Sequence, residues 1–244
     1  MKAFGITDRG AVRKENQDCF KIYAPEDSSL LCAVLCDGMG GAQAGSVAST
    51  IAADAFMFHA ANSIDESSTA ADIRSILIDA VNYANIKVYD KSFSDFTCMG
   101  MGSTLVAVIS NGKKTFVANI GDSRAYMIYR GKAEQITKDH SYVEELVARG
   151  EISADEAKNH PKKNIITRAV GVEASVKCDV FEIKPPAGAR ILLCSDGISN
   201  TVTDEELASV LDKHREAEMA AKVLLALAMS RGASDNVTVV IAQR

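Results

Sequence analysis

Four short acidic segments, spread over almost the whole chain, each place an aspartate beside an apolar run. They are Asn16-Gln17-Asp18, Asp37-Gly38-Met39-Gly40-Gly41, Ser195-Asp196-Gly197 and Ser234-Asp235-Asn236. The apolar runs are typical of β-strands, so folding could bring the carboxylates to one end of a sheet. Mg²⁺ and Mn²⁺ prefer oxygen ligands and keep several waters, so a few carboxylates and a backbone carbonyl suffice for each ion. The sequence therefore predicts a site for hard divalent cations.

The alternative for each segment is an ordinary turn, because Asp-Gly is a common turn dipeptide. Asp37 and Asp196 are both followed by glycine, which lets the backbone turn sharply and leaves a carbonyl such as that of Gly38 exposed for coordination. One Asp-Gly pair alone favours the turn, whereas the whole set of segments favours the cation site.

Apolar patterning predicts the elements that position these aspartates. Strands are expected over residues 2–7, 19–23, 30–36, 104–109, 115–120, 124–129, 133–137, 190–194 and 236–242. Helices are expected over 46–59, 70–91, 204–211 and 216–229, with two short polar helices over 142–150 and 153–160. Turns at Asn111-Gly112 and Gly121-Asp122 join successive strands, which indicates antiparallel hairpins. The almost continuous apolar run 30–36 indicates a strand that is buried on both faces.

Length and composition indicate one ordinary globular domain over residues 1–244. The chain is 47% hydrophobic and 24% charged, and it has no apolar run long enough to cross a bilayer. Its start lacks the apolar region of a signal peptide, so we expect a cytoplasmic protein with no membrane partner. A net charge of −5 without a basic stripe argues against binding to nucleic acid. The six cysteines lack zinc-site spacing, and those within apolar runs are expected to be small buried hydrophobic residues.

Further motifs occur in a fixed order along the chain. They are Gly10 with Arg13, Gly102-Ser103-Thr104, Ala118-Asn119-Ile120-Gly121-Asp122-Ser123-Arg124, Thr137-Lys138-Asp139-His140-Ser141 and Ile166-Thr167-Arg168-Ala169-Val170-Gly171. Together with the four acidic segments, they make the sequence resemble the bacterial metal-dependent serine/threonine protein phosphatases of the PPM, or PP2C, type. The resemblance extends from about Gly5 to Ala242. It implies an α+β fold, a four-layer αββα sandwich of two antiparallel sheets flanked by helix pairs, with a flap subdomain at about residues 141–165.

The resemblance also implies two Mn²⁺ or Mg²⁺ ions per chain. Asp37 would bridge them, Asp196 and Asp235 would hold the first ion, and the Gly38 carbonyl would help to hold the second. Asp18 would lie in or just outside the water shell of the second ion. A third, weaker ion, as in bacterial relatives, would use Asp122 together with Asp196.

By the same resemblance, a hydroxide bridging the ions attacks the phosphorus directly, and Arg13 binds the substrate phosphate. Arg13 and Asp37 are thus the predicted catalytic residues. One departure is Met39, where some members have a histidine that is proposed to protonate the leaving group. His140 and His160 are candidates for that proton, although a hydrogen-bonded turn is the favoured interpretation of His140. A second departure is Gln17, where some eukaryotic members have a glutamate ligand.

The implied function is hydrolysis of phosphoserine and phosphothreonine in proteins. The expected partners are phosphorylated proteins and a cognate serine/threonine kinase, and the chain is expected to be a monomer. Two alternatives stay open. One is a catalytically inactive module that binds phosphoproteins or a kinase, and the other is a phosphatase dedicated to one signalling phosphoprotein.

Overall fold

Two antiparallel β-sheets form the centre of the molecule in the computed structural model, which describes residues 1–41 and 44–243. The first sheet contains, in spatial order, β1 (Lys2–Asp8), β11 (Val237–Gln243), β10 (Arg190–Cys194), β7 (Arg124–Tyr129) and β8 (Lys132–Gln135). The second contains β2 (Asp18–Tyr23), β3 (Leu31–Met39), β5 (Leu105–Ser110), β6 (Thr115–Ile120) and β9 (Asp179–Ile183), while the short β4 (Gly102–Ser103) pairs with β3. The antiparallel hairpin expected at the Asn111-Gly112 turn is confirmed, because β5 pairs with β6. The hairpin expected at Gly121-Asp122 is wrong, because that turn leads from β6 in the second sheet to β7 in the first, where β7 pairs with β8 and β10.

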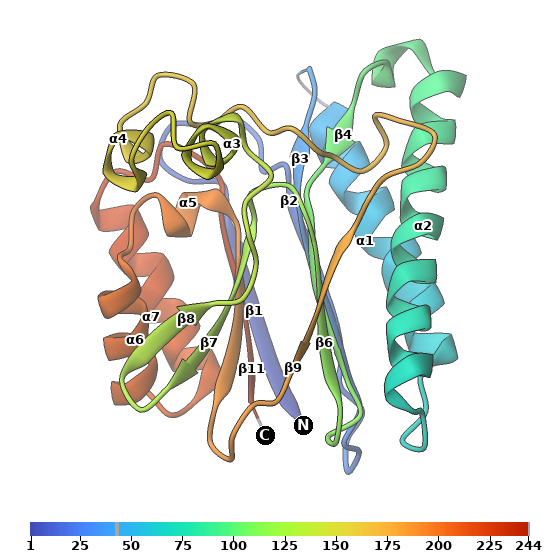
Figure 1. Cartoon of the computed structure of the whole chain (residues 1–244), viewed down its shortest axis with the longest axis vertical. Helices are drawn as coiled ribbons and strands as arrows, with labels where there is room; N and C mark the ends of the chain where they lie inside the picture. The colour runs from blue at the N-terminus through green and yellow to red at the C-terminus, as the bar shows by residue number, and fades with distance from the viewer. Residues whose placement is uncertain (42–43, 244) are drawn as a thin grey trace.

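A pair of long helices covers the outer face of each sheet (Figure 1). The helices α1 (Ala44–Ser63) and α2 (Ala70–Ser94) pack on the second sheet, and α6 (Asp204–Lys213) and α7 (Ala217–Ser230) pack on the first. Shorter helices are η1 (Phe96–Cys98), α3 (Tyr142–Ala148), α4 (Ala154–Lys158) and α5 (Asp196–Ser199). The predicted four-layer αββα sandwich is therefore confirmed.

Strand β3 shows why its sequence is almost continuously apolar. Its side chains alternate, so that Cys32 and Val34 pack in the core under α1 and α2, whereas Leu31 and Leu35 pack in the core between the two sheets. All four are fully buried, as the pattern predicted. Burying a large aliphatic side chain contributes about 2 kcal/mol, so a strand with two apolar faces joins three layers of the sandwich. Cys36 is also buried, and its free thiol belongs to the packing as expected.

The structure adds a strand that the sequence did not reveal. Residues 179–183 form β9, an edge strand that pairs with β6 and is buried only in part, so its apolar pattern is weak. The flap helices α3 and α4 end earlier than predicted, and α3 buries Val143 and Leu146, so it has more apolar surface than expected. Both lie at the upper end of the sandwich in Figure 1, the end that also holds α5.

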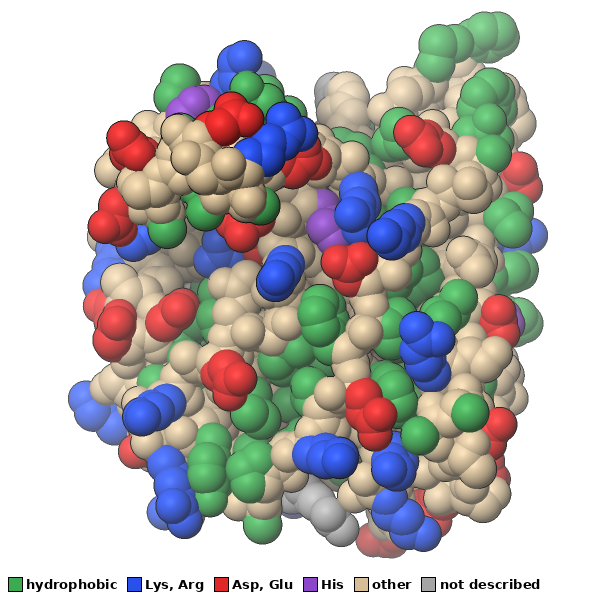
Figure 2. All heavy atoms as spheres, viewed as in Figure 1, with side chains coloured by type: hydrophobic (Ala, Val, Ile, Leu, Met, Phe, Trp, Pro, Cys, Tyr) green, Lys and Arg blue, Asp and Glu red, His purple; other side chains and the backbone are tan. Residues whose placement is uncertain are grey.

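On the face drawn in Figure 2, acidic and basic side chains are interspersed, and no broad basic area is visible. Within the described residues, none of the helices combines the length and the apolar character that a bilayer span requires.

Candidate metal centre and active site

A cavity of about 280 Å³ lies where the strands that precede or follow the acidic segments come together. Its lining includes Arg13, Asp37, Gly38, Asp122, Asp196 and Asp235, all of which are predicted site residues. Asp37 and Gly38 are the last residues of β3 before Met39, Asp196 opens α5 two residues after the end of β10, and Asp235 lies two residues before the start of β11. Because neighbouring strands are antiparallel, the end of one and the start of the next reach the same edge of the sandwich.

Asp18 is the one predicted ligand that lies behind the cavity rather than on its wall. It opens β2 and faces Asp37 of β3 across the strand pair. Its Oδ2 accepts hydrogen bonds from the hydroxyls of Thr238 at 2.6 Å and Ser195 at 2.8 Å; Thr238 belongs to β11 of the opposite sheet, and Ser195 directly follows β10 of that sheet. Asp18 therefore ties the two sheets together beneath the acidic cavity.

Burial and mutual repulsion keep these carboxyl groups from ionising easily. Burial, the largest cause, and neighbouring aspartates together raise the pKa of Asp122 to about 7 and that of Asp196 to about 6. The pKa of Asp37 lies well above its usual range, first because of burial and then because of Asp18 and Asp196. A divalent cation among them would stabilise the ionised forms.

Two carboxylate oxygens, Oδ1 of Asp18 and Oδ1 of Asp196, are buried without a hydrogen-bond partner. Buried polar atoms are rarely left unpaired, so these oxygens fit a ligand that the protein chain does not supply. All the candidate metal-ligand atoms here are oxygens, which suits Mn²⁺ or Mg²⁺. Over residues 1–41 and 44–243, however, no three Asp, Glu, His or Cys side chains form a group able to hold an ion by themselves. The residues therefore fit ions that also bind water and backbone carbonyls.

The Gly38 backbone lies in a space that no other residue fits. A Cβ at this position would lie 1.9 Å from the carbonyl oxygen of Gly45 and 2.8 Å from that of Gln17. The Gly38 amide donates to the Gln17 carbonyl at 3.0 Å, which fixes the strand end beside β2. The glycine thus lets the chain pass close to α1 at the wall of the cavity.

Arg13 lies at the mouth of the cavity on the loop between β1 and β2. Its Nη2 donates to Oδ2 of Asp235 at 2.6 Å, and its side chain is about half exposed. The loop is held by Asn236, whose Nδ2 donates to the carbonyls of Arg9 and Glu15 and whose Oδ1 accepts from the Gln17 amide. The guanidinium therefore lies directly above the carboxylates.

Both departures noted in the sequence, Met39 and Gln17, lie on the wall of the cavity. Met39 lines the cavity, and no histidine does so among the described residues. His140 is a hydrogen-bonded turn residue, as favoured: its Nδ1 accepts from the Gly121 amide at 3.1 Å, and its Nε2 lies 3.1 Å from Oδ2 of Asp179. Because Nδ1 is an acceptor, Nε2 carries the proton and donates to Asp179. Burial, the largest cause, lowers the pKa of His140, which favours this neutral form.

Three further residues contribute to the site without having been assigned a role. Thr104 lines the cavity, and its Oγ1 accepts from the Asp37 amide at 2.9 Å, which fixes the end of β3. The Gly102-Ser103-Thr104 motif could be recognised in the sequence, but the hydrogen bond from the Asp37 amide to Thr104 could not be predicted. Asn164 and Ile166, from the end of the flap and just beyond it, close one side of the cavity. No periodic pattern marks them, because they lie in irregular structure between elements.

Comparison with known proteins agrees with this geometry. The family model described as protein phosphatase 2C matches residues 10–228. The serine/threonine phosphatase stp of Listeria monocytogenes is 38% identical over 244 residues, spanning all of this chain and 96% of the relative. The serine/threonine protein phosphatase PstP of Mycobacterium tuberculosis is 38% identical over 237 residues, which are 97% of this chain and 43% of that protein.

Solved structures show the same fold. Serine/threonine phosphatase Stp1 from Staphylococcus aureus superposes with a TM-score of 0.89 at 34% identity, covering 100% of this chain and 94% of that one. The catalytic domain of PstP in complex with two manganese ions gives a TM-score of 0.83 at 34% identity, covering 99% and 97% of the two chains. Sequence, fold and site agree, and this chain therefore belongs to the protein phosphatase 2C family and is a protein phosphatase.

Proposed function

We propose that this chain hydrolyses phosphoserine and phosphothreonine in proteins and that the reaction depends on two Mn²⁺ or Mg²⁺ ions. The observation that carries the proposal is the convergence of aspartates from distant segments in one cavity, with buried oxygens that lack a partner. It is supported by relatives named as serine/threonine phosphatases and by a related structure in complex with manganese.

We assign the ligands as the family resemblance implies, in keeping with their places in or behind the cavity wall. Asp37 lies at the centre of the acidic group and is assigned to both ions, because its pKa is raised by all four of the other aspartates. Asp196 and Asp235 would hold the first ion. The Gly38 carbonyl would help to hold the second, with Asp18 behind it. Asp122, on the turn after β6, is assigned to a third, weaker site shared with Asp196.

When bound, the two ions would lower the pKa of a coordinated water and neutralise charge on the phosphoryl oxygens. Arg13 offers the substrate phosphate a planar pair of donors, and its present partner Asp235 shows that it reaches the carboxylates. Attack by water is direct in this proposal, because the lining among the described residues contains no serine, cysteine or histidine and its aspartates are assigned to the ions. The single lining hydroxyl, that of Thr104, already bonds to the Asp37 amide and to Ser123.

The proton for the leaving alkoxide comes from water in this proposal. Met39 has no proton to donate, and His140 is engaged on both ring nitrogens with Gly121 and Asp179. His160 does not line the cavity, and its Nδ1 accepts from the Lys162 amide within the flap.

The flap gives substrate proteins a charged surface beside the cavity. Lys163 is exposed, yet it is close enough to Asp196 to lower the pKa of that carboxyl. A substrate protein would therefore meet Lys163 and Arg13 at the entrance. We further propose that the substrates are supplied by a serine/threonine kinase and that the chain acts as a monomer.

The test is phosphate release from a phosphothreonine peptide, measured with Mn²⁺, with a chelator and with the variant Asp196→Asn. Activity is expected only for the unmodified chain with Mn²⁺. The matched control is Asp90→Asn, an exposed position on α2, which should keep full activity. Binding of Mn²⁺ without hydrolysis of the peptide or of an aryl phosphate would favour the inactive binding module. Activity that survives both chelation and Asp196→Asn would reject the metal mechanism.

A further inference from the structure

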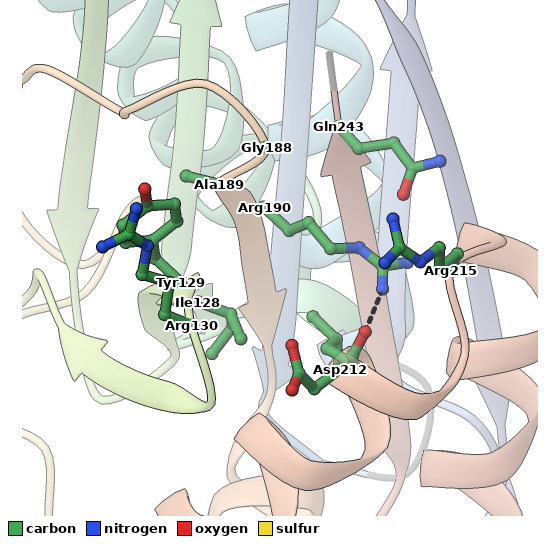
Figure 3. Close-up of a pocket in the computed structure, with 10 residues that line it drawn as sticks. Ile128, Tyr129, Arg130, Gly188, Ala189, Arg190, Asp212, Arg215 and Gln243 are labelled. Atoms are coloured by element: carbon green, nitrogen blue, oxygen red, sulfur yellow. Dashed lines mark hydrogen bonds between the residues drawn. The ribbon is translucent and has the colours of Figure 1, made fainter.

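A second cavity, of about 330 Å³, lies at the opposite end of the first sheet (Figure 3). Arg190 opens β10 there and pairs with Gln243 at the end of β11. The acidic cavity lies beyond the other end of β10, where Asp196 follows. At about 3.3 Å per residue, the six steps from Arg190 to Asp196 separate the two places by roughly 20 Å. The second cavity is therefore remote from the acidic one.

Arg190 is a buried cation, with 8% of its surface exposed. Its Nη1 donates to the carbonyls of Leu211 at 2.6 Å and His214 at 2.7 Å, which lie at the end of α6. These two contacts account for Nη1, because cationic side chains commonly pair with the last carbonyls of a helix. The other nitrogens, Nε and Nη2, are buried and have no hydrogen-bond partner. Burial lowers the pKa of Arg190, and no neighbouring carboxylate opposes that effect.

The unpaired nitrogens of Arg190 form the edge of a guanidinium that binds oxyanions. Arg124 in the same sheet shows the geometry: its Nε donates to Oδ1 of Asp139 at 3.0 Å and its Nη2 to Oδ2 at 2.7 Å. Parallel donors of this kind match the two oxygens of a carboxylate or a phosphate. Arg190 has the same pair of donors and, in the described part of the chain, no acceptor for them.

The rest of the lining adds positive charge. Arg130 and Arg215 also line the cavity, and Asp212 is the single acidic residue among the described lining residues. None of the three arginines forms an ion pair in residues 1–41 and 44–243. Figure 3 shows the Arg190 and Arg215 side chains extending into the same part of the cavity. An anion beside the buried Arg190 would be attracted by these positive charges and would offset their mutual repulsion.

We propose that this cavity binds a phosphate group through Nε and Nη2 of Arg190, with Arg215 beside them and Arg130, which lies over the Tyr129 ring across the cavity, as a more distant cation. Arg130 and Arg215 are exposed and lie on the β7–β8 turn and the α6–α7 connection, so they can move to admit the ligand. The phosphate group would come either from inorganic phosphate, the product of a phosphatase, or from a phosphorylated side chain of a protein. The site goes beyond the proposed function and does not depend on the metal centre.

The test is isothermal titration of the full chain with inorganic phosphate in a low-salt buffer freed of metal ions by a chelating resin. The unmodified chain should bind one phosphate with a Kd of about 1 mM or tighter. The double variant Arg130→Ala/Arg215→Ala, at exposed positions, should bind about tenfold more weakly or worse, since it loses the charge-assisted contact with Arg215 and the charge of Arg130. Arg190→Lys keeps the charge but loses the paired donors, and it should weaken binding similarly.

Two controls locate the phosphate. Arg74→Ala, an exposed arginine on α2, should leave the affinity unchanged, as should Asp196→Asn in the acidic cavity. The proposal is overturned if the unmodified chain does not bind phosphate at about 10 mM, or if the double variant binds as tightly as the unmodified chain. The double variant decides this even if Arg190→Lys does not fold.

A second titration, with a phosphothreonine peptide and its unphosphorylated form, distinguishes the two sources of phosphate. Binding of the phosphopeptide about tenfold tighter than inorganic phosphate, and lost in the double variant, would assign the site to a phosphorylated protein. Equal or weaker binding of the peptide would assign it to free phosphate. Both outcomes support a phosphate site at Arg190. Loss of phosphate binding in Asp196→Asn but not in the double variant would refute that site.

Discussion

Replacing Asn236 by alanine should release the loop that carries Arg13. The Asn236 side chain is buried, and it makes three hydrogen bonds to that loop: Nδ2 donates to the carbonyls of Arg9 at 2.8 Å and Glu15 at 2.9 Å, and Oδ1 accepts from the Gln17 amide at 2.8 Å. No other single side chain in the described residues makes as many bonds to this loop. The Asn236 side-chain amide therefore fixes the position of Arg13 at the mouth of the cavity.

The size of the effect follows from these bonds. A buried hydrogen bond contributes about 1 kcal/mol net, so losing all three would cost about 3 kcal/mol. If water enters and pairs with the freed backbone groups, the cost falls to about 1.5 kcal/mol. Either value leaves a domain with a stability of about 5–15 kcal/mol folded, so activity can be measured on the variant. If Arg13 binds the phosphate as proposed, KM for a phosphopeptide should rise more than kcat falls.

The assay is urea unfolding of the metal-free chain, compared with that of Asn62→Ala. The Asn62 amide donates to the Phe58 carbonyl on the exposed side of α1, so its loss should cost less than about 0.5 kcal/mol. A difference between the two variants of at least about 1 kcal/mol is expected. Equal losses would show that Asn236 does not hold the loop, and an unchanged KM would show that the loop does not position Arg13 for substrate.

Replacing Arg124 by lysine should cost about 2 kcal/mol in urea unfolding, because lysine cannot form the paired bonds to Asp139. Gly38→Ala should sharply lower the yield of folded protein, since its Cβ would lie 1.9 Å from a carbonyl oxygen of α1. Gly41→Ala should fold normally, because no atom of the described residues lies within 4 Å of a Cβ at that position. Burial, as the largest cause, raises the pKa of Asp122 to about 7 in the folded chain. At pH 6 this carboxyl group is therefore mostly protonated in the folded chain and ionised in the unfolded chain. The metal-free chain should therefore lose about 1.4 kcal/mol from this group between pH 6 and 8, and thermal unfolding of Asp122→Asn should lack that loss.

The layers of the fold could be predicted from the sequence because local patterns determine them. The run 30–36 is apolar at every position, and a strand can satisfy that pattern only if both of its faces are buried. That requirement places β3 between a sheet and a helix layer, as the structure shows. The Asn111-Gly112 turn likewise fixed the pairing of β5 with β6.

The remaining features depend on contacts between residues far apart in the chain. Arg13 pairs with Asp235 over a separation of 222 residues, and Asp18 bonds to Thr238 over 220. No local pattern encodes such contacts. Strand β9 escaped prediction for a related reason: as a half-buried edge strand it shows little alternation, and it exists because the free edge of β6 pairs with it.

The two cavities follow one electrostatic rule at opposite ends of the same strand. Where the chain supplies a partner for a buried charge, as Asp139 does for Arg124, the pair is complete and nothing further is needed. At Asp196 a buried carboxylate oxygen lacks a partner, and at Arg190 two buried guanidinium nitrogens lack one. Leaving charged groups unpaired in the interior is costly, so each arrangement persists most readily where a ligand of opposite sign completes it. The acidic end fits cations and the arginine end fits a phosphate group, and β10 joins the two.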